Sequence, residues 1–267
     1  MAFHEIQKIT LIGAGKLATN LAFSLKKKGF TILQVYNRSR EPGMKLAEKV
    51  STSYIDDLRN LSGNADLYAL AVSDAALDEV SPRIRLRDQL VIHFSGTAEI
   101  GLLKDSSENY GVLYPPQTFT LQESAGFLNI PLCIEANNSE SEEKLASFAA
   151  TFSDKIFRVN SGQRRTIHLS AIFAGNFTNF MYSIAEDLLA GNGLTMTLLE
   201  PIIEKTKANA MQNNIFRFQT GPAIREDLGI IKTHLELLSE KPEFREIYRL
   251  LSECIINYKH QDQNDKL

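Results

Sequence analysis

Two glycines and an alanine near the start of the chain have the spacing of a phosphate-binding turn. Gly13, Gly15 and Ala18 form the pattern G-x-G-x-x-A directly after a short apolar run. The first glycine permits a tight turn, the second lets a pyrophosphate approach the backbone, and the alanine lets the following helix pack close to a sheet. The first N–H groups of that helix would face the phosphates. We therefore expect a dinucleotide to be bound by Gly13, Gly15, Lys16, Leu17 and Ala18.

The residues that follow the next apolar run select the type of cofactor. Rossmann enzymes that use NAD usually place Asp or Glu there, about 20 residues after the glycines, to hold the ribose 2′-hydroxyl. This chain instead has Asn37, Arg38, Ser39 and Arg40. A carboxylate would repel a 2′-phosphate, whereas guanidinium and hydroxyl groups would bind it. The segment predicts NADP(H), with NADPH as the reduced form, over NAD(H); the alternative is a solvated basic loop.

Three further residues come at the end of the next clear strand, expected over residues 65–72. Val72, Ser73 and Asp74 lie at its carboxyl end, which is where open α/β sheets bind their ligands. We expect these residues to line the ribose next to the nicotinamide. For Asp74, an equally good interpretation is that it caps the helix expected over residues 75–80.

Candidate catalytic residues follow the later strands. His93 and Ser95 come at the end of the strand expected over residues 89–94, and Gln117 follows a pair of prolines that stiffens its loop. All three are expected near the nicotinamide, where Ser95 could hydrogen-bond a substrate carbonyl or the cofactor carboxamide. His93 alternates with buried positions, so a histidine of the core is an equally good interpretation of it.

The long helical pattern over residues 163–190 carries polar side chains on an otherwise apolar face. His168, Gly175 and Asn179 share that face, and Asn176 lies about 80° from it on an ideal helix. Buried polar groups are costly unless they are paired or used, so we interpret His168, Asn176 and Asn179 as candidate substrate contacts. His168 is the expected proton donor because histidine titrates nearest to neutrality. The alternative is that Gly175 only lets another helix approach.

The elements that position these residues change in character near residue 160. Before it, apolar runs alternate with helical patterns, which is typical of a parallel sheet with right-handed crossovers. After it, the sequence shows four helical patterns and a polar tail, residues 259–267, that is expected to fray. We expect α/β then all-α: an N-terminal Rossmann doubly wound parallel sheet in residues 1–160, and a C-terminal helical domain in residues 161–267. The expected strands cover residues 8–12, 31–36, 52–55, 65–72, 89–94, 111–114, 131–135 and 155–159; the later helices cover 163–190, 195–214, 225–238 and 242–258.

The composition narrows the range of partners. Of 267 residues, 43% are hydrophobic, and 29 basic against 32 acidic residues give a net charge of −3. Nucleic acid is not an expected partner, because its binders concentrate an excess of Lys and Arg. No apolar run reaches the roughly 20 residues that cross a bilayer, and residues 1–5 do not begin an export signal, so we expect a cytoplasmic protein with no membrane partner. Cys133 and Cys254 are expected to be buried free thiols, and no metal site is expected from the spacing of cysteines and histidines.

Taken together, these motifs resemble the superfamily of pyrroline-5-carboxylate reductases and β-hydroxyacid dehydrogenases. Within it, the chain is most similar to a branch labelled NADP oxidoreductase, in which a Rossmann domain precedes a helical domain of unknown function. The resemblance implies hydride transfer between NADP(H) and a small-molecule substrate bound between the two domains. It also implies a homodimer built through the C-terminal helices. The segments that carry the resemblance, besides the glycine turn, are Asn37–Ser39, Ala71–Asp74, His93–Gly96, Pro115–Phe119, Arg165–Asn179 and Gly221–Ala223.

One departure from that superfamily bears on the chemistry. Its hydroxyacid dehydrogenases use a lysine on the first long helix after the sheet, but this chain has no lysine between Arg165 and Tyr182. The lysine mechanism therefore does not carry over, and His168 is the residue in this stretch that readily exchanges a proton. The leading hypothesis is an NADP(H)-dependent oxidoreductase. The alternative is a non-catalytic regulatory or sensor protein that binds NADP(H) and acts through dimerisation.

Overall fold

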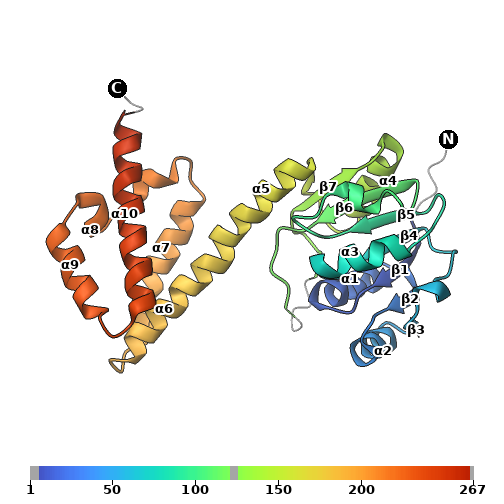
Figure 1. The fold of residues 1–267 in the computed structure, drawn as a ribbon, viewed down its shortest axis with the longest axis horizontal. Helices are drawn as coiled ribbons and strands as arrows, with labels where there is room; N and C mark the ends of the chain where they lie inside the picture. Colours follow the sequence, from blue (N-terminus) through green and yellow to red (C-terminus); the bar gives the residue numbers. More distant parts are fainter. Residues whose placement is uncertain (1–5, 121–125, 265–267) are drawn as a thin grey trace. The chain divides into compact units, whose positions relative to one another are not determined.

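The computed structural model describes residues 6–120 and 126–264 of the chain (Figure 1). The chain forms two compact units, Met1–Phe177 and Thr178–Leu267. Among the described residues, the first unit contains the sheet and the second contains helices alone. The predicted fold class, a Rossmann sheet followed by a helical region, is confirmed. Residues 1–5, in which no export signal is expected, lie outside the described residues.

The described part of the first unit has an eight-stranded sheet with the order β3-β2-β1-β4-β5-β6-β7-β8. The strands β1 to β6 run parallel to their neighbours, whereas β7 is antiparallel to β6 and parallel to β8. The sequence predicts each of these strands, but not the reversed direction of β7. The bounds are β1 Lys8–Ile12, β2 Thr31–Tyr36, β3 Ser53–Ile55, β4 Leu67–Leu70, β5 Leu90–His93, β6 Asn109–Tyr114, β7 Leu132–Ala136 and β8 Ile156–Arg158.

The central strands are buried on both faces because helices cover the sheet on two sides. In β1, Leu11 belongs to one hydrophobic core and the next residue, Ile12, to another. Such strands read as continuous apolar runs rather than as alternating patterns. The carboxyl ends of the parallel strands meet at one edge of the sheet, which brings the predicted site residues that follow five of the strands to that edge. The first core includes side chains of α1 (Lys16–Lys27), α2 (Arg40–Lys49) and α4 (Ser139–Ala150), and the second includes side chains of α3 (Asp74–Val80).

The helix that carries His168 packs with the sheet. Helix α5 (Ser161–Ala171) follows β8 and continues as a π-helix, Ile172–Phe177, within the first unit. Its start is fixed by a capping box, in which Asn160 and Gln163 each accept a hydrogen bond from the other's backbone N–H at 2.9 Å. Ile167 packs against the core of β6 and β7. The predicted domain boundary at residue 160 stays a prediction, but the contacts of α5 are with the sheet.

Helices are the only regular secondary structure among the described residues of the second unit. The helix predicted over residues 225–238 begins later, at Leu228 as α9, because Glu226 adopts the left-handed conformation with φ 56° and ends the short helix α8. The expected frayed tail is wrong for residues 259–264, where the last helix continues through a segment without Gly or Pro. Cys254 is exposed, which corrects the expectation that both cysteines are buried; Cys133 is buried. The bounds are α6 Thr178–Ala190, α7 Glu200–Ala210, α8 Pro222–Arg225, α9 Leu228–Leu237 and α10 Pro242–Asn264.

Through the two described stretches, no helix combines the length and the apolar character that crossing a membrane requires.

Candidate active site

The glycine turn between β1 and α1 has the geometry that its sequence predicts. Gly13 adopts φ +119°, and a Cβ there would overlap the carbonyl of Ala71 on the neighbouring strand. Its N–H donates to the Tyr36 carbonyl at 2.8 Å. A Cβ on Gly15, in contrast, would meet nothing within 4 Å. Gly13 is therefore required by the fold itself, while Gly15 leaves open space in front of the helix.

The amino end of α1 is available to an anion. Gly15 is its N-cap and supplies no side-chain hydrogen bond, so the first N–H groups of the helix have no cap within the described chain. Such groups, with the positive end of the helix dipole, form a ready site for phosphate. A pyrophosphate in the open space beside Gly15 would meet these N–H groups, and this arrangement fits a dinucleotide.

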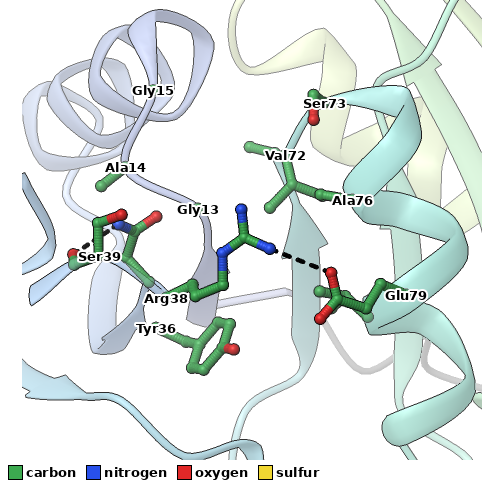
Figure 2. Close-up of a pocket in the computed structure, with 13 residues that line it drawn as sticks. Gly13, Ala14, Gly15, Tyr36, Arg38, Ser39, Val72, Ser73, Ala76 and Glu79 are labelled. Atoms are coloured by element: carbon green, nitrogen blue, oxygen red, sulfur yellow. Dashed lines mark hydrogen bonds and ion pairs between the residues drawn. The ribbon is translucent and has the colours of Figure 1, made fainter.

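A cavity lies in front of this turn, and Figure 2 shows the side chains that line it. The ends of β2 and β4 form its other walls. Arg38 points across the cavity from the end of β2 toward Glu79 on α3 (Figure 2). The structure therefore brings together residues from three loops that lie far apart in the sequence. The predicted cofactor residues that line the cavity are Gly13, Gly15, Asn37, Arg38, Ser39, Val72 and Ser73.

The other predicted cofactor residues lie outside this lining. Ala18 is fully buried in the main core, and Leu17 packs against that core. Lys16 is exposed at the first position of α1. Arg40 begins α2, and its Nε lies 3.3 Å from the sulfur of Met44. Ala18 thus has the packing role expected of the third small residue in the motif.

Asp74 is not the cap of α3, while its predicted contact with the ribose stays a prediction. Helix α3 begins at Asp74 with Ser73 as its N-cap, so Asp74 is the first helical residue rather than the cap. Its carboxylate accepts a hydrogen bond from the hydroxyl of Thr97. The Ser95 hydroxyl accepts from the N–H groups of Thr97 and Ala98 at 3.0 and 2.9 Å. Asp74 therefore ties the loop after β4 to the loop after β5.

Glu79 is a cavity residue that the sequence analysis did not single out. Its carboxylate lies 3.2 Å from the guanidinium of Arg38, with the two side chains 53% and 78% exposed. Exposed ion pairs of this kind contribute at most about 1 kcal/mol. Arg38 is therefore free to exchange Glu79 for a more strongly charged partner such as a phosphate.

His93 is a buried and neutral histidine. It is fully buried, its Nδ1 accepts from the Ser95 N–H at 3.1 Å, and its Nε2 has no partner among the described residues. Burial, followed by the positive charge of Arg164, lowers the pKa of His93 to about 3. The ring is therefore neutral rather than cationic at neutral pH, and it positions the Ser95 backbone.

A second cavity in the first unit contains His168. Gln117 and Asn176 also line it, while His93 and Ser95 do not. The His168 Nδ1 lies 3.1 Å from the hydroxyl of Tyr114, a residue at the end of β6. Three of the six predicted catalytic residues therefore share one cavity; a fourth, Asn179, lies on α6 in the second unit.

Tyr114 is the functional candidate that the sequence analysis missed. It is 7% exposed, and burial raises the pKa of its phenol to about 12, which keeps the hydroxyl protonated at neutral pH. The two rings meet edge to face, with their centroids 5.9 Å apart. The sequence feature that could have identified Tyr114 is its position at the carboxyl end of a parallel strand, where α/β proteins bind their ligands.

Gly96 makes room for the His168 ring. A Cβ at Gly96 would lie 2.5 Å from the His168 Nδ1 and 2.6 Å from its Cγ. Because Gly96 has no side chain, α5 can approach the end of β5. This is a close approach of the kind that only glycine permits.

A buried ion pair holds α5 in this position. Arg164 is fully buried and donates to the Ser95 carbonyl at 2.8 Å and to the Glu135 carboxylate at 3.1 Å. The other Glu135 oxygen accepts from the N–H and hydroxyl of Ser161 at 2.9 and 2.8 Å. Arg164 lies one helical turn before His168, so this network joins the His168 helix to β7 and to the loop after β5.

Two family models match the sequence. Residues 130–255 match a family described as a domain of unknown function (DUF2520), and residues 2–77 match the shikimate / quinate 5-dehydrogenase family. A search of curated proteins found no significant match.

Solved structures resemble nearly the whole chain. A "putative NADP oxidoreductase" from Bacteroides fragilis shares 38% identity, with 94% of this chain and 98% of that chain covered and a TM-score of 0.86. An imine reductase from Myxococcus stipitatus, in complex with NADP+, shares 15% identity over 97% of this chain and 94% of that chain, with a TM-score of 0.63. A pyrroline-5-carboxylate reductase from Streptococcus pyogenes shares 18% identity over 94% and 98% of the two chains, with a TM-score of 0.58. The similarities to the imine reductase and to the pyrroline-5-carboxylate reductase show that this chain shares their fold.

Proposed function

Because the chain belongs to the family of the Bacteroides fragilis oxidoreductase, we propose that it is an NADP(H)-dependent oxidoreductase. It would transfer a hydride between NADP(H) and a small substrate. The observation that carries the proposal is the position of Arg38, which projects from the end of β2 into the same cavity as the glycine turn. The B. fragilis protein and the M. stipitatus reductase, whose names include NADP, support the choice of cofactor.

The residues of the first cavity fit a dinucleotide with a 2′-phosphate. The open space beside Gly15 and the uncapped start of α1 suit the pyrophosphate. Arg38, with the backbone and side chain of Ser39, would bind the 2′-phosphate, and Arg38 would leave its weak pair with Glu79 to do so. Val72 and Ser73, at the end of β4, would contact the ribose next to the nicotinamide.

The bound nicotinamide would supply or accept the hydride, and the chain would supply the proton. His168, which lines the second cavity, would donate it to the carbonyl oxygen or imine nitrogen of a substrate bound there. The Tyr114 hydroxyl is hydrogen-bonded to the Nδ1 atom of the His168 ring, which leaves the His168 Nε2 for the substrate. A protonated imidazole that donates from Nε2 becomes neutral, and solvent can reprotonate it for the next turnover. Gly96 and the Arg164–Glu135 pair hold the ring in place.

Cofactor binding tests the first part of this proposal. Fluorescence titration with NADPH and NADH should show at least about tenfold tighter binding of NADPH, a difference of about 1.4 kcal/mol. Gly15→Val should abolish binding with a normal circular dichroism spectrum, because nothing in the protein fills the space around a Gly15 Cβ. Equal affinities for the two cofactors would contradict the proposed NADP preference.

Turnover tests the second part. NADPH oxidation with a panel of imines, keto acids and aldehydes should be measurable in the wild type and reduced in His168→Ala. Tight NADPH binding without oxidation of any substrate in the panel would favour the sensor interpretation. Full activity in His168→Ala would reject His168 as the proton donor and leave the cofactor assignment intact.

A further inference from the structure

The contact between Tyr114 and His168 bears on which nitrogen of the imidazole ring carries a hydrogen. The Tyr114 hydroxyl lies 3.1 Å from the His168 Nδ1. A neutral imidazole has a hydrogen on one nitrogen and a lone pair on the other, and the hydrogen bond that one nitrogen makes fixes the state of the other. What His168 offers to the cavity therefore depends on what Tyr114 offers to Nδ1.

Tyr114 offers a hydrogen to Nδ1. The side chain is buried, and this burial raises the pKa of the phenol to about 12, so the hydroxyl keeps its hydrogen at neutral pH. Its hydrogen-bond partner among the described residues is Nδ1 of His168. A buried O–H group without an acceptor is costly. With a neutral ring, the phenol therefore donates to Nδ1, and the hydrogen of the ring lies on Nε2.

Carboxylates that contact α5 are paired with arginines instead of with the His168 ring. Glu135 pairs with Arg164, and Glu99 pairs with Arg165. A carboxylate beside Nδ1 could only accept, so it would hold the hydrogen of a neutral ring on Nδ1 and leave Nε2 as a base. A tyrosine at the same place has the opposite effect on a neutral ring.

The backbone at Gly96 limits the orientations of the same ring. A Cβ at Gly96 would lie 2.5 Å from the His168 Nδ1 and 2.8 Å from its Cβ. The Nδ1 side of the ring is therefore enclosed between residue 96 and Tyr114, whereas the half-buried His168 also lines the second cavity. Nε2, at the far end of the ring from its Cβ, is the nitrogen that remains for a ligand.

We propose that Tyr114 is a positioning residue that keeps a hydrogen on the His168 Nε2, so that the resting ring presents a donor to the cavity whether it is neutral or cationic. With a neutral ring the phenol donates to Nδ1, and with a cationic ring the phenol oxygen accepts from the Nδ1–H, because a hydroxyl group can do both. This proposal rests on the proposed function, in which His168 gives a proton to the substrate. It assigns to Tyr114 the choice of the ring nitrogen that gives it.

The ring nitrogens of labelled protein report this state directly. Two-dimensional ¹⁵N–¹H spectra distinguish a ring nitrogen that carries a hydrogen from one that does not, and the signals that His168→Ala removes belong to His168. At about pH 8.5, well above the usual histidine pKa of about 6.5, we expect Nδ1 without a hydrogen and Nε2 with one. In Tyr114→Phe both tautomers should be populated, which moves the two ¹⁵N shifts toward each other.

Turnover gives a second measurement on the same variant. Tyr114→Phe removes one oxygen atom and should lower kcat for NADPH oxidation by about threefold to tenfold, the effect of one lost hydrogen bond. The KM for NADPH should stay unchanged, because Tyr114 does not belong to the described lining of the cofactor cavity. Tyr110→Phe removes a hydroxyl near the other end of β6, outside the described lining of the second cavity, and should change neither kcat nor the His168 shifts.

The outcomes separate this inference from the proposed function. A neutral wild-type ring with its hydrogen on Nδ1 would overturn the role of Tyr114, and so would an identical tautomer state in the wild type and in Tyr114→Phe with a normal circular dichroism spectrum. A tautomer change in Tyr114→Phe without any change in kcat would support the role of Tyr114 and reject His168 as the proton donor. The same tautomer change in a protein that does not oxidise NADPH would support the inference and reject the proposed enzymatic activity.

Discussion

After the end of β2, Arg38 and Arg40 have different surroundings although they are only two positions apart in the sequence. Arg38 lines the cofactor cavity, whereas Arg40 lies outside it beside Met44. We therefore expect Arg38→Ala to weaken NADPH binding by about tenfold or more, with little effect on NADH, because it removes the guanidinium that faces the 2′-phosphate. Arg40→Ala, as the matched control, should have a smaller effect.

Fluorescence titration with both cofactors measures the difference between the Arg38→Ala and Arg40→Ala variants.

Glu79→Gln should in turn strengthen NADPH binding by up to about fivefold, since it releases Arg38 from an exposed ion pair worth at most about 1 kcal/mol. An Arg40→Ala variant that loses as much NADPH affinity as Arg38→Ala would show that both arginines hold the phosphate.

His93 makes the stability of the first unit sensitive to acid. Its folded pKa is about 3, below the usual value of 6.5. Between these values the unfolded chain binds the proton and the folded protein does not, so stability falls as the pH falls. This group alone should cost about 2 kcal/mol between pH 7 and pH 5.

Urea unfolding at the two pH values checks this expectation. His93→Leu should lose less stability than the wild type between pH 7 and pH 5, because the leucine has no proton to take up on unfolding. An identical pH dependence in His93→Leu and the wild type would argue against a neutral buried His93.

At the scale of elements, α5 is held by one buried arginine rather than by its helical propensity. Arg164 is fully buried against Glu135, whose side chain is 13% exposed. Removing one partner of a buried pair leaves the other charge uncompensated, at a typical cost of about 3–5 kcal/mol. We expect Arg164→Met to lower the free energy of unfolding by an amount in this range and to reduce kcat through displacement of His168.

The matched control lies just before the same helix. Arg158 on β8 pairs with Glu142 and Glu143, and its side chain is 52% exposed. Arg158→Met should therefore cost about 1 kcal/mol or less in urea unfolding. Similar losses in the two variants would mean that the Arg164 pair contributes no more than a surface pair.

The π-helix that follows α5 alters which residues share a face. On an ideal helix, Gly175 and Asn179 share the His168 face and Asn176 lies away from it. In the structure, the turn Ile172–Phe177 is π-helical, and Gly175 and Asn176 line the cavity of His168. Asn179 lies beyond this turn in the second unit, and its proposed contact with substrate stays a prediction.

For the whole molecule, the second unit exposes many large apolar side chains. Leu198 and Ile202 are each 62% exposed, Leu228 is 68% exposed and Leu237 is 76% exposed. Exposed apolar surface of this kind marks an interaction site, and in soluble oligomers it is most often covered by a second copy. We propose a homodimer through the helices of the second unit, and expect light scattering at micromolar concentration to give twice the mass of the chain.

Charge substitutions on α7 localise the interface. Ile202→Glu should shift the protein toward monomer, because a carboxylate is costly in an apolar interface. Lys207→Glu, on the same helix at a side chain that is 71% exposed, should leave the mass unchanged. A monomeric wild type would reject the dimer.

The sequence by itself determined those features that depend on near neighbours in the chain. The glycine turn, the strands of the sheet and the basic end of β2 were readable because each is encoded within a few residues, by glycine geometry, apolar runs or the absence of a carboxylate. The predicted assignment of Gly13, Gly15 and Arg38 to one site also followed, since parallel strands end at one edge of a sheet.

Only the tertiary structure decided which distant side chains meet. Tyr114 and His168 are 54 positions apart, and Arg164 reaches Glu135 across 29. Such contacts depend on how α5 packs against β6 and β7, and no local pattern specifies that packing. The same holds for Glu79 opposite Arg38, because that pair results from the assembled sheet and helices rather than from the residues beside it in the sequence, and for the choice between the two interpretations that the sequence left open for His93.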